Sequence, residues 1–105
     1  MNVITLKHLK AAYLKHPVAE ERLLNWHKHM KENTFLTLEA LRKIEPTADP
    51  VTGTDYMCFD INGKSFRLIV RITWGKTVFV KEFLTHGEYT KKYVKSRGKK
   101  AGRKK

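Results

Sequence analysis

The sequence predicts an α+β fold, in which N-terminal helices pack on one face of a small antiparallel sheet and a short helix follows the sheet. Three observations predict it. Apolar residues recur at helical spacing in the first half of the chain, they alternate with a period of two over residues 56–84, and a helix-capping pattern follows directly. A chain of 105 residues suffices for one small core, so we expect a single domain over residues 1–95.

The first half of the chain reads as an edge strand and three helices. Residues 2–4 are mostly apolar and suit a short strand, and Thr5 is expected to cap a helix over residues 6–15. Because the residue before a proline avoids the helical conformation, Pro17 should open a second helix that ends near Lys31. Thr37 should cap a third helix over residues 38–43. The second helix is expected to bury Val18, Leu23, Leu24, Trp26 and Met30.

The second half reads as three antiparallel strands, residues 56–61, 65–74 and 77–84. Asn62-Gly63 is a strong hairpin signal, and Trp74-Gly75-Lys76 supplies a second turn. Alternate side chains of the middle strand, from Phe66 to Trp74, should lie beneath the helices.

The other side chains of the middle strand should lie on an uncovered face of the sheet. This face would carry Arg67 and Arg71, and the next strand would add Lys81 between Phe79 and Phe83. A sheet face that mixes cations and aromatic rings is typical of RNA binding through phosphate contacts and base stacking.

The chain is strongly basic, with a net charge of +12 and a pI near 10.0. Such a charge indicates an anionic partner: nucleic acid, an anionic membrane surface or an acidic protein. Residues 91–105 contain nine basic and no acidic side chains, so the first ninety residues carry only +3. Residues 96–105 lack large apolar side chains and are predicted to form a disordered basic tail. Such a tail either grips phosphates or only aids solubility.

Several protein classes are disfavoured by the sequence. No apolar run approaches the roughly 20 residues of a membrane span, and the N-terminus lacks the apolar region of a signal peptide. The single cysteine, Cys58, cannot form an internal disulfide, which favours the cytoplasm and a packing role for this thiol. His27 and His29 diverge on a helix and no cysteine or carboxylate cluster joins them, so we expect neither a metal nor a cofactor.

The residues richest in chemistry lie in the segment VFVKEFLTHGEYTKKY, residues 78–93. Thr85-His86-Gly87-Glu88 fits a capping box, which places His86 in the first turn of a helix and Tyr89 three residues later on the same side. Lys81 lies just upstream on the strand. A histidine, a tyrosine and a lysine at such a junction can move protons and hold a phosphate. The same residues also occur as a solvated histidine and a core tyrosine with no chemistry.

Four stretches carry a resemblance to a known family. The first is the start MNVIT, which precedes a predicted helix. The second is a connector of the form "L-x-x-x-F/Y-P-x-A-D", which resembles Leu38-x-x-Leu41-x-x-x-Glu45-Pro46-x-Ala48-Asp49. The third is a hairpin of the form "F-x-I-x-G-N-x-Y/F-R-L-I", which is similar to Phe59-Asp60-Ile61-x-Gly63-x-x-Phe66-Arg67-Leu68-Ile69. The fourth is a strand-to-helix segment of the form "V-Y-I-K/R … T-H-x-E-Y-D", which is similar to Val78-x-Val80-Lys81 through Thr85-His86-x-Glu88-Tyr89.

Over residues 1 to about 93, the chain therefore resembles the HigB-type toxins of bacterial type II toxin–antitoxin modules, within the RelE-like group of ribosome-dependent mRNA endonucleases. It departs from their pattern at three positions. Glu45 stands where an aromatic residue is usual, Lys64 replaces an asparagine, and Thr90 replaces an aspartate.

The resemblance implies cleavage of mRNA in the ribosomal A site, with no metal, by attack of a 2′-hydroxyl on the adjacent phosphate. We interpret His86 and Tyr89 as the proton-transfer pair, without deciding which is the base. A histidine suits either role near neutral pH, whereas a tyrosine does so only if cations lower its pKa from about 10. Arg67 and Lys81 are expected to do this and to contact the phosphate. Residues expected to bind flanking phosphates or ribosomal RNA are Arg71, Lys91, Lys92, Lys95 and Arg97.

Two other functions stay open. A non-catalytic RNA-binding or ribosome-associated protein would use the same face and tail. A DNA-binding role has less support, because no helix-turn-helix pattern with a basic recognition helix is visible. The resemblance also implies mRNA and the ribosome as partners, together with a helix-turn-helix antitoxin of the HigA type.

Overall fold

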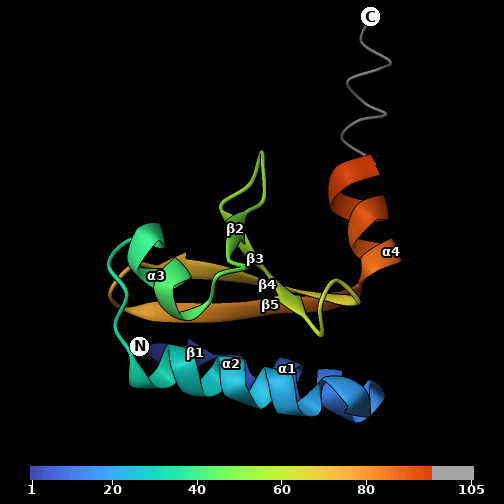
Figure 1. The fold of residues 1–105 in the computed structure, drawn as a ribbon, viewed down its shortest axis with the longest axis horizontal. Helices are drawn as coiled ribbons and strands as arrows, with labels where there is room; N and C mark the ends of the chain where they lie inside the picture. Colours follow the sequence, from blue (N-terminus) through green and yellow to red (C-terminus); the bar gives the residue numbers. More distant parts are fainter. Residues whose placement is uncertain (96–105) are drawn as a thin grey trace, which may run out of the picture.

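Figure 1 shows the computed structural model, which describes residues 1–95. The predicted basic tail, with Arg97, lies outside the described residues. The elements follow the predicted order of helices, sheet and C-terminal helix. Their bounds are β1 Asn2–Ile4, α1 Leu6–Lys15, the 3₁₀ turn η1 Pro17–Ala19, α2 Glu20–Glu32, α3 Leu38–Ile44, β2 Asp49–Pro50, β3 Tyr56–Ile61, β4 Phe66–Thr73, β5 Thr77–Thr85, α4 His86–Tyr89 and the π-helical segment η2 Thr90–Lys95.

The sheet has five strands in the order β1-β5-β4-β3-β2. The predicted antiparallel meander of β3, β4 and β5 is confirmed, whereas β1 runs parallel to β5 and makes the sheet mixed. Asn62 and Gly63 adopt left-handed backbone angles, with φ of 55° and 67°, in the loop that joins β3 to β4. Asparagine and glycine tolerate that conformation better than other residues, which is why this dipeptide predicts the hairpin.

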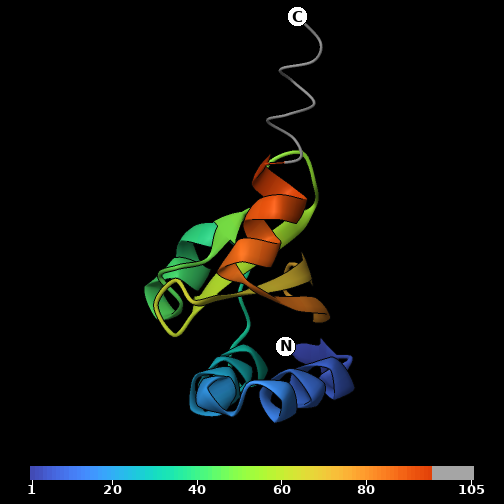
Figure 2. The same cartoon turned by 90° about the vertical axis from the view of Figure 1, so that its right-hand side faces the viewer.

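Helices α1 and α2 lie side by side against one face of the sheet (Figures 1 and 2). Leu23, Trp26 and Met30 of α2 follow helical spacing and are completely buried, as predicted. Val18 and Leu24 are instead 73% and 44% exposed. Val18 lies in the 3₁₀ turn before α2, and Leu24 is rotated about 100° from Leu23 on the helix. None of the helices within residues 1–95 has the length and apolar character needed to cross a bilayer.

Of the predicted helix caps, one is wrong. Thr5 has a left-handed backbone with φ of 66° and makes no side-chain cap. Its hydroxyl donates instead to the carbonyl of Val80, at 2.9 Å, and fastens the start of α1 to β5. Thr37 does cap α3, because its hydroxyl accepts from the amide of Ala40 at 3.1 Å.

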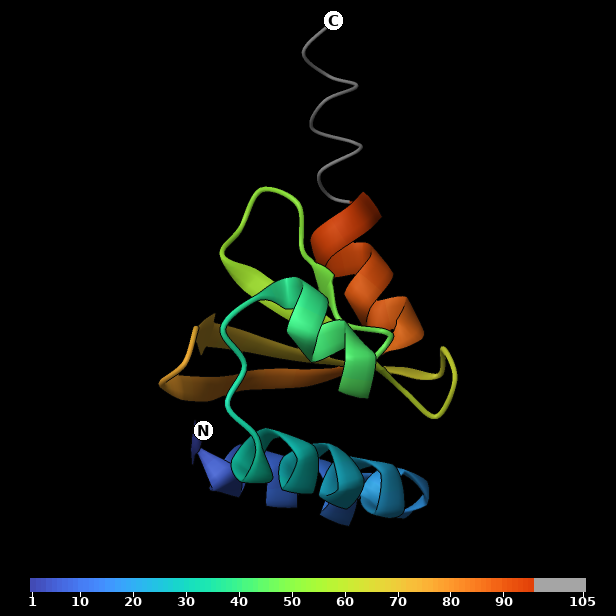
Figure 3. The ribbon, with the colours of Figure 1, turned by 60° about the vertical axis from the view of Figure 1, so that its left-hand side comes forward.

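The second face of the sheet is partly covered, contrary to the prediction. Figures 2 and 3 show α4 and the following π-helical segment rising from the side of the sheet opposite α1 and α2. Tyr93 of this segment packs in a second apolar cluster with Val51, Cys58 and Ile69. Ile69, which was expected on an uncovered face, has no exposed surface. The alternation on β4 therefore serves two cores, one under each helical layer.

An irregularity between β4 and β5 changes which way the end of β5 faces. Ile69 pairs with Glu82 and the next residue, Val70, pairs with Val80, so Lys81 is an extra residue in the strand. Beyond this bulge, Phe83 packs with the α1–α2 core and Leu84 with the second cluster. The prediction that Lys81 shares a side with Phe83 is therefore wrong, because simple alternation stops at the bulge.

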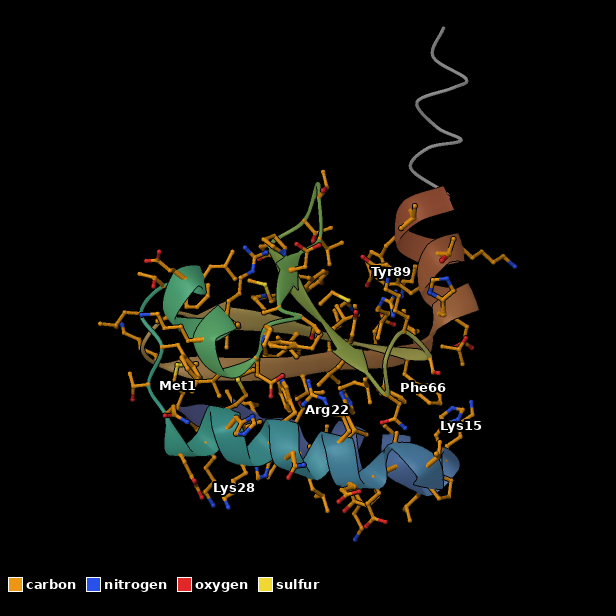
Figure 4. The ribbon with its side chains drawn as sticks, in the orientation of Figure 1. Met1, Lys15, Arg22, Lys28, Phe66 and Tyr89 are labelled. Carbon is orange, nitrogen blue, oxygen red and sulfur yellow. The ribbon has the colours of Figure 1, made fainter. Side chains whose placement is uncertain are left out.

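A buried carboxylate joins α2 to the end of α3. Glu45 is only 1% exposed and accepts hydrogen bonds from the guanidinium of Arg22, at 2.5 and 3.1 Å. The imidazole Nδ1 of His29 lies 2.6 Å from the same carboxylate. Arg22, which lies between α2 and the sheet in Figure 4, also donates to the carbonyl of Asp60 at 3.4 Å. These partners offset the desolvation of Glu45 and explain a charge where the resembled family has an aromatic ring.

We predict that Glu45→Ala lowers the free energy of unfolding by about 3 kcal/mol, because it leaves Arg22 and His29 without their buried partner. Urea denaturation of the purified protein measures this change. Glu32→Ala, an exposed residue at the end of α2, is the matched control and should change stability by less than about 0.5 kcal/mol. Equal effects of the two substitutions would show that the buried cluster does not hold the helical layer.

Candidate active site

The junction of β5 and α4 is held in a fixed geometry by a capping box, as predicted. The Thr85 hydroxyl accepts from the amide of Glu88 at 3.2 Å, and the Glu88 carboxylate accepts from the amide of Thr85 at 2.9 Å. The amide of His86 donates to the carbonyl of Ser65, at 2.9 Å, in the loop before β4. The first turn of α4 is therefore fastened to both neighbouring strands.

Arg67 brings three of the four predicted catalytic residues together. Its Nη2 lies 3.3 Å from Nδ1 of His86, and its guanidinium carbon lies 5.5 Å from the centre of the Tyr89 ring. Tyr89 occupies the space between α4 and the sheet in Figure 4. Because a guanidinium carries only donors, Nδ1 of His86 must accept in this contact.

Asp60 is a site residue that the sequence analysis missed. It lies directly opposite Arg67 on β3, and its carboxylate is 3.3 Å from Nε of Arg67. The carbonyl of Lys64 accepts a further hydrogen bond from Nη1 of Arg67 at 3.0 Å. These two contacts hold the guanidinium against the sheet, and Arg67 as a whole is only 8% exposed. A two-residue Asn62-Gly63 turn would pair Arg67 with Cys58. The observed pairing with Asp60 requires the longer loop 62–65, so the sequence pattern could not identify this partner.

Arg67 and Tyr89 line an open cleft of about 400 Å³, beside the segment that joins α3 to β2. Arg42 and Lys64 add two further cations to its walls, and Asp49 pairs with Arg42 at 3.1 Å. The volume is within the range of small-ligand sites. Within residues 1–95, no three His, Cys, Asp or Glu side chains are grouped so that they could hold a metal ion.

The environment of Tyr89 keeps its hydroxyl protonated. Burial raises the pKa of Tyr89, and the nearby Cys58 raises it further, while Arg67 only partly opposes them. Arg67 lowers the pKa of Tyr89 as expected, but burial outweighs this effect, so the net shift is upward. Burial also raises the pKa of the Cys58 thiol to about 12, so this sulfur stays protonated and is unsuited to act as a nucleophile.

Lys81 is not part of the group around Arg67. Its ammonium lies 5.3 Å from the centre of the Tyr56 ring, and the guanidinium of Arg71 lies 5.9 Å from the same ring. Arg67 and Arg71 are four residues apart on β4, or about 13 Å. We call the cluster of Tyr56, Arg71 and Lys81 the Tyr56 patch. The Tyr56 patch therefore lies along β4 from Arg67, and Lys81 belongs to this patch.

The three predicted RNA-binding lysines after α4 differ in their surroundings. Lys91 is exposed and makes no ion pair within residues 1–95. Lys92 is paired with both carboxylate oxygens of Glu82 at 2.9 Å, which reduces its availability to a phosphate. Lys95 is the last residue that the structure describes.

Glu82 ties the π-helical segment to β5. It accepts hydrogen bonds from Lys92 and from the hydroxyl of Tyr93. Burial disfavours the charged form of Glu82, but the hydrogen bonds from Tyr93 and Lys92 outweigh it and lower the pKa of this carboxyl. The ionised carboxylate therefore stabilises the packing of this segment on the sheet.

We predict that Glu82→Gln destabilises the fold by about 1 kcal/mol at neutral pH. The pKa of Glu82 is lower in the folded state than the value of about 4.3 expected for an unfolded chain. Its contribution is thus present above that value and is lost as the pH falls through the folded pKa. Urea denaturation at neutral and acid pH should show the difference between wild type and variant shrinking in acid. A difference that persists unchanged in acid would exclude the carboxylate as its cause; Glu39→Gln, exposed on α3, is the control.

Comparison with known proteins identifies the family. A family model described as HigB_toxin, RelE-like toxic component of a toxin–antitoxin system, matches residues 19–92. No curated protein matches the chain. The matched span includes α2, the whole antiparallel meander and α4, and therefore all of the residues that surround Arg67. The chain belongs to the HigB family of RelE-like toxins.

Proposed function

We propose that this toxin is a ribosome-dependent endoribonuclease that cleaves mRNA by general acid/base attack of the 2′-hydroxyl on the adjacent phosphate, without a metal ion. The observation that carries the proposal is the position of Arg67, which contacts both His86 and Tyr89 and lines the open cleft. A cation between two proton-transfer groups is the arrangement that such a reaction needs.

The reaction makes three demands on the site. The 2′ oxygen loses its proton as it bonds to phosphorus, the bond from phosphorus to the 5′ oxygen breaks, and that oxygen gains a proton. The products are a 2′,3′-cyclic phosphate and a 5′-hydroxyl. Arg67 would hold the phosphate oxygens, since a guanidinium can donate two parallel hydrogen bonds to them.

The two proton-transfer roles can be assigned to different residues. The raised pKa of Tyr89 supports a neutral phenol that donates its proton to the leaving 5′ oxygen. His86 would then accept the 2′ proton. When Arg67 turns from His86 to the phosphate, Nδ1 of the imidazole loses its donor and becomes free to accept.

Residues outside this group would bind the flanking RNA. In the Tyr56 patch, Arg71 and Lys81 would contact phosphates and the ring of Tyr56 would stack on a base. Lys91 and Lys92 would add phosphate or ribosomal RNA contacts, together with Lys95 and Arg97. In the cytoplasm the ribosome would orient the message, so the protein need not bind free RNA tightly.

The Tyr56 patch also favours a second candidate function. Its cations and ring lie away from His86 and Tyr89, and they could grip RNA or the ribosome without any cleavage. In that case, the toxic effect would be lost when positive charge is removed from this patch or from residues 96–105, and it would not depend on His86.

Membership of a toxin–antitoxin family implies a cognate antitoxin. We propose that it is a helix-turn-helix protein of the HigA type that neutralises the toxin. The basic site would favour acidic contacts from such a partner.

We expect induced expression of the wild type in a bacterial host to arrest growth and to cut transcripts within codons. His86→Ala and Tyr89→Phe should each reduce cleavage by about 10²–10⁴-fold, because each removes a proton-transfer group. Tyr89→Phe is preferred to alanine, since it keeps the ring that packs on Arg67 and Tyr93. Sequencing of RNA ends measures the cuts.

The control for this experiment is Lys43→Ala, an exposed lysine on α3 that does not line the cleft. All variants should fold and sediment with ribosomes as the wild type does. If His86→Ala and Tyr89→Phe stay fully toxic, or if only Arg71→Ala and Lys81→Ala relieve toxicity, the binding-only function is supported instead.

A further inference from the structure

The outer side of the helical layer carries a groove that the proposed cleavage does not use. Two adjoining hollows, of about 260 and 210 Å³, share Leu6 and His27 as lining residues. The first lies between α1 and α2, and the second continues to the N-terminal residues Met1 to Val3. We call this continuous depression the α1–α2 groove.

The floor of the α1–α2 groove is apolar. Leu6, Leu9 and Tyr13 of α1 line one side, and Leu24 of α2 lines the other. Leu6 and Leu24 are 45% and 44% exposed, although both belong to helices whose neighbouring residues form the core. The exposure of Leu24, which the helical pattern did not predict, is therefore part of a shaped surface rather than an isolated side chain.

The rim of the α1–α2 groove is basic. Lys7 and Lys10 border it on α1, and Lys31 borders it on α2. All three lysines are exposed, no acidic residue lines either hollow, and none of the three makes an ion pair within residues 1–95. Burial lowers the pKa of His27, which lines both hollows, and the nearby charge of Lys31 lowers it further.

We propose that the α1–α2 groove is the docking site for an acidic amphipathic helix of a partner protein. Apolar side chains of that helix would replace water over Leu6, Tyr13 and Leu24, and its carboxylates would meet Lys7, Lys10 and Lys31. Leu6 to Tyr13 spans about 10 Å of α1, which matches roughly two turns of a docked helix. This surface is separate from the cleavage site, and the inference does not rest on the proposed function.

Charge and shape favour this occupant over the others. A second copy of this chain would bring another basic molecule to a lysine-rimmed groove, against like-charge repulsion. RNA would satisfy the lysines, but it has no aliphatic face for the leucines. A membrane would require apolar side chains that project beyond the lysines, whereas these line a depression between two helices.

The position of the groove adds a functional consequence. Figure 2 shows α1 and α2 on one side of the sheet and α4 on the other. A helix bound in the α1–α2 groove would therefore leave Arg67, His86 and Tyr89 uncovered. For the cleavage proposed above, such a partner would act by blocking entry to the ribosome with its bulk, or by reaching round the sheet with a second segment; the docking itself does not depend on that function.

The test uses the full-length chain and a synthetic acidic peptide of about 15 residues, with leucines on one helical face and glutamates beside them. A peptide of the same composition in scrambled order is the control probe. We expect saturable binding of the first peptide, with NMR shift changes confined to α1 and α2.

Two matched substitutions localise the binding. Leu24→Glu should weaken it by at least about tenfold, while Leu14→Glu should change it by less than about twofold, since Leu14 is 67% exposed and lies outside the groove. Circular dichroism checks that both variants fold. Equal binding of the scrambled peptide, shift changes at α4 or the Tyr56 patch, or preferential Leu24-dependent binding to anionic phosphatidylglycerol vesicles would each overturn the proposal.

Discussion

The carboxylate of Glu45 connects the helical layer to the wall of the cleft. It holds Arg22 and His29 of α2, and the chain that follows it directly, residues 46–49, lines the cleft beside Arg67 and Tyr89. Arg22 also reaches the carbonyl of Asp60, whose own carboxylate orients Arg67. One buried acid thus sets the position of α2, of the end of α3 and of one side of the site. Removal of its partners would leave an uncompensated charge in the core, which is why all three residues act as a unit.

The sheet separates two surfaces with different chemistry. One face packs on α1 and α2, and their outer side carries a lysine-rimmed apolar groove. The other face carries the group around Arg67 under α4 and, further along β4, the Tyr56 patch. The bulge at Lys81 lets two consecutive residues of β5, Lys81 and Glu82, reach this second face. Lys81 joins Tyr56, and Glu82 anchors the segment that covers Ile69.

The periodicity of apolar residues and the capping motifs predicted the order of the elements and the bounds of β3. These two signals depend only on residues that are neighbours in the sequence. They also placed His86 and Tyr89 correctly at the start of α4. Long-range contacts were beyond such patterns. The hydroxyl of Thr5 finds Val80 rather than its own helix, and one inserted residue reverses the side on which Phe83 lies. The pKa of Tyr89 rises because α4 buries its ring, an effect that depends on packing and not on the sequence around it.

The position of Cys58 makes its thiol a natural probe of local opening in this protein. It is the one thiol in the chain, it is 5% exposed, and it packs beneath Tyr89 and Tyr93. Cys58 also lines the open cleft, where burial shields most of its thiol from solvent and raises its pKa. Its rate of labelling under native conditions therefore reports how often the cleft widens or the C-terminal helical segment lifts from the sheet. The unmodified wild-type chain can thus show how often the site around Arg67 comes apart.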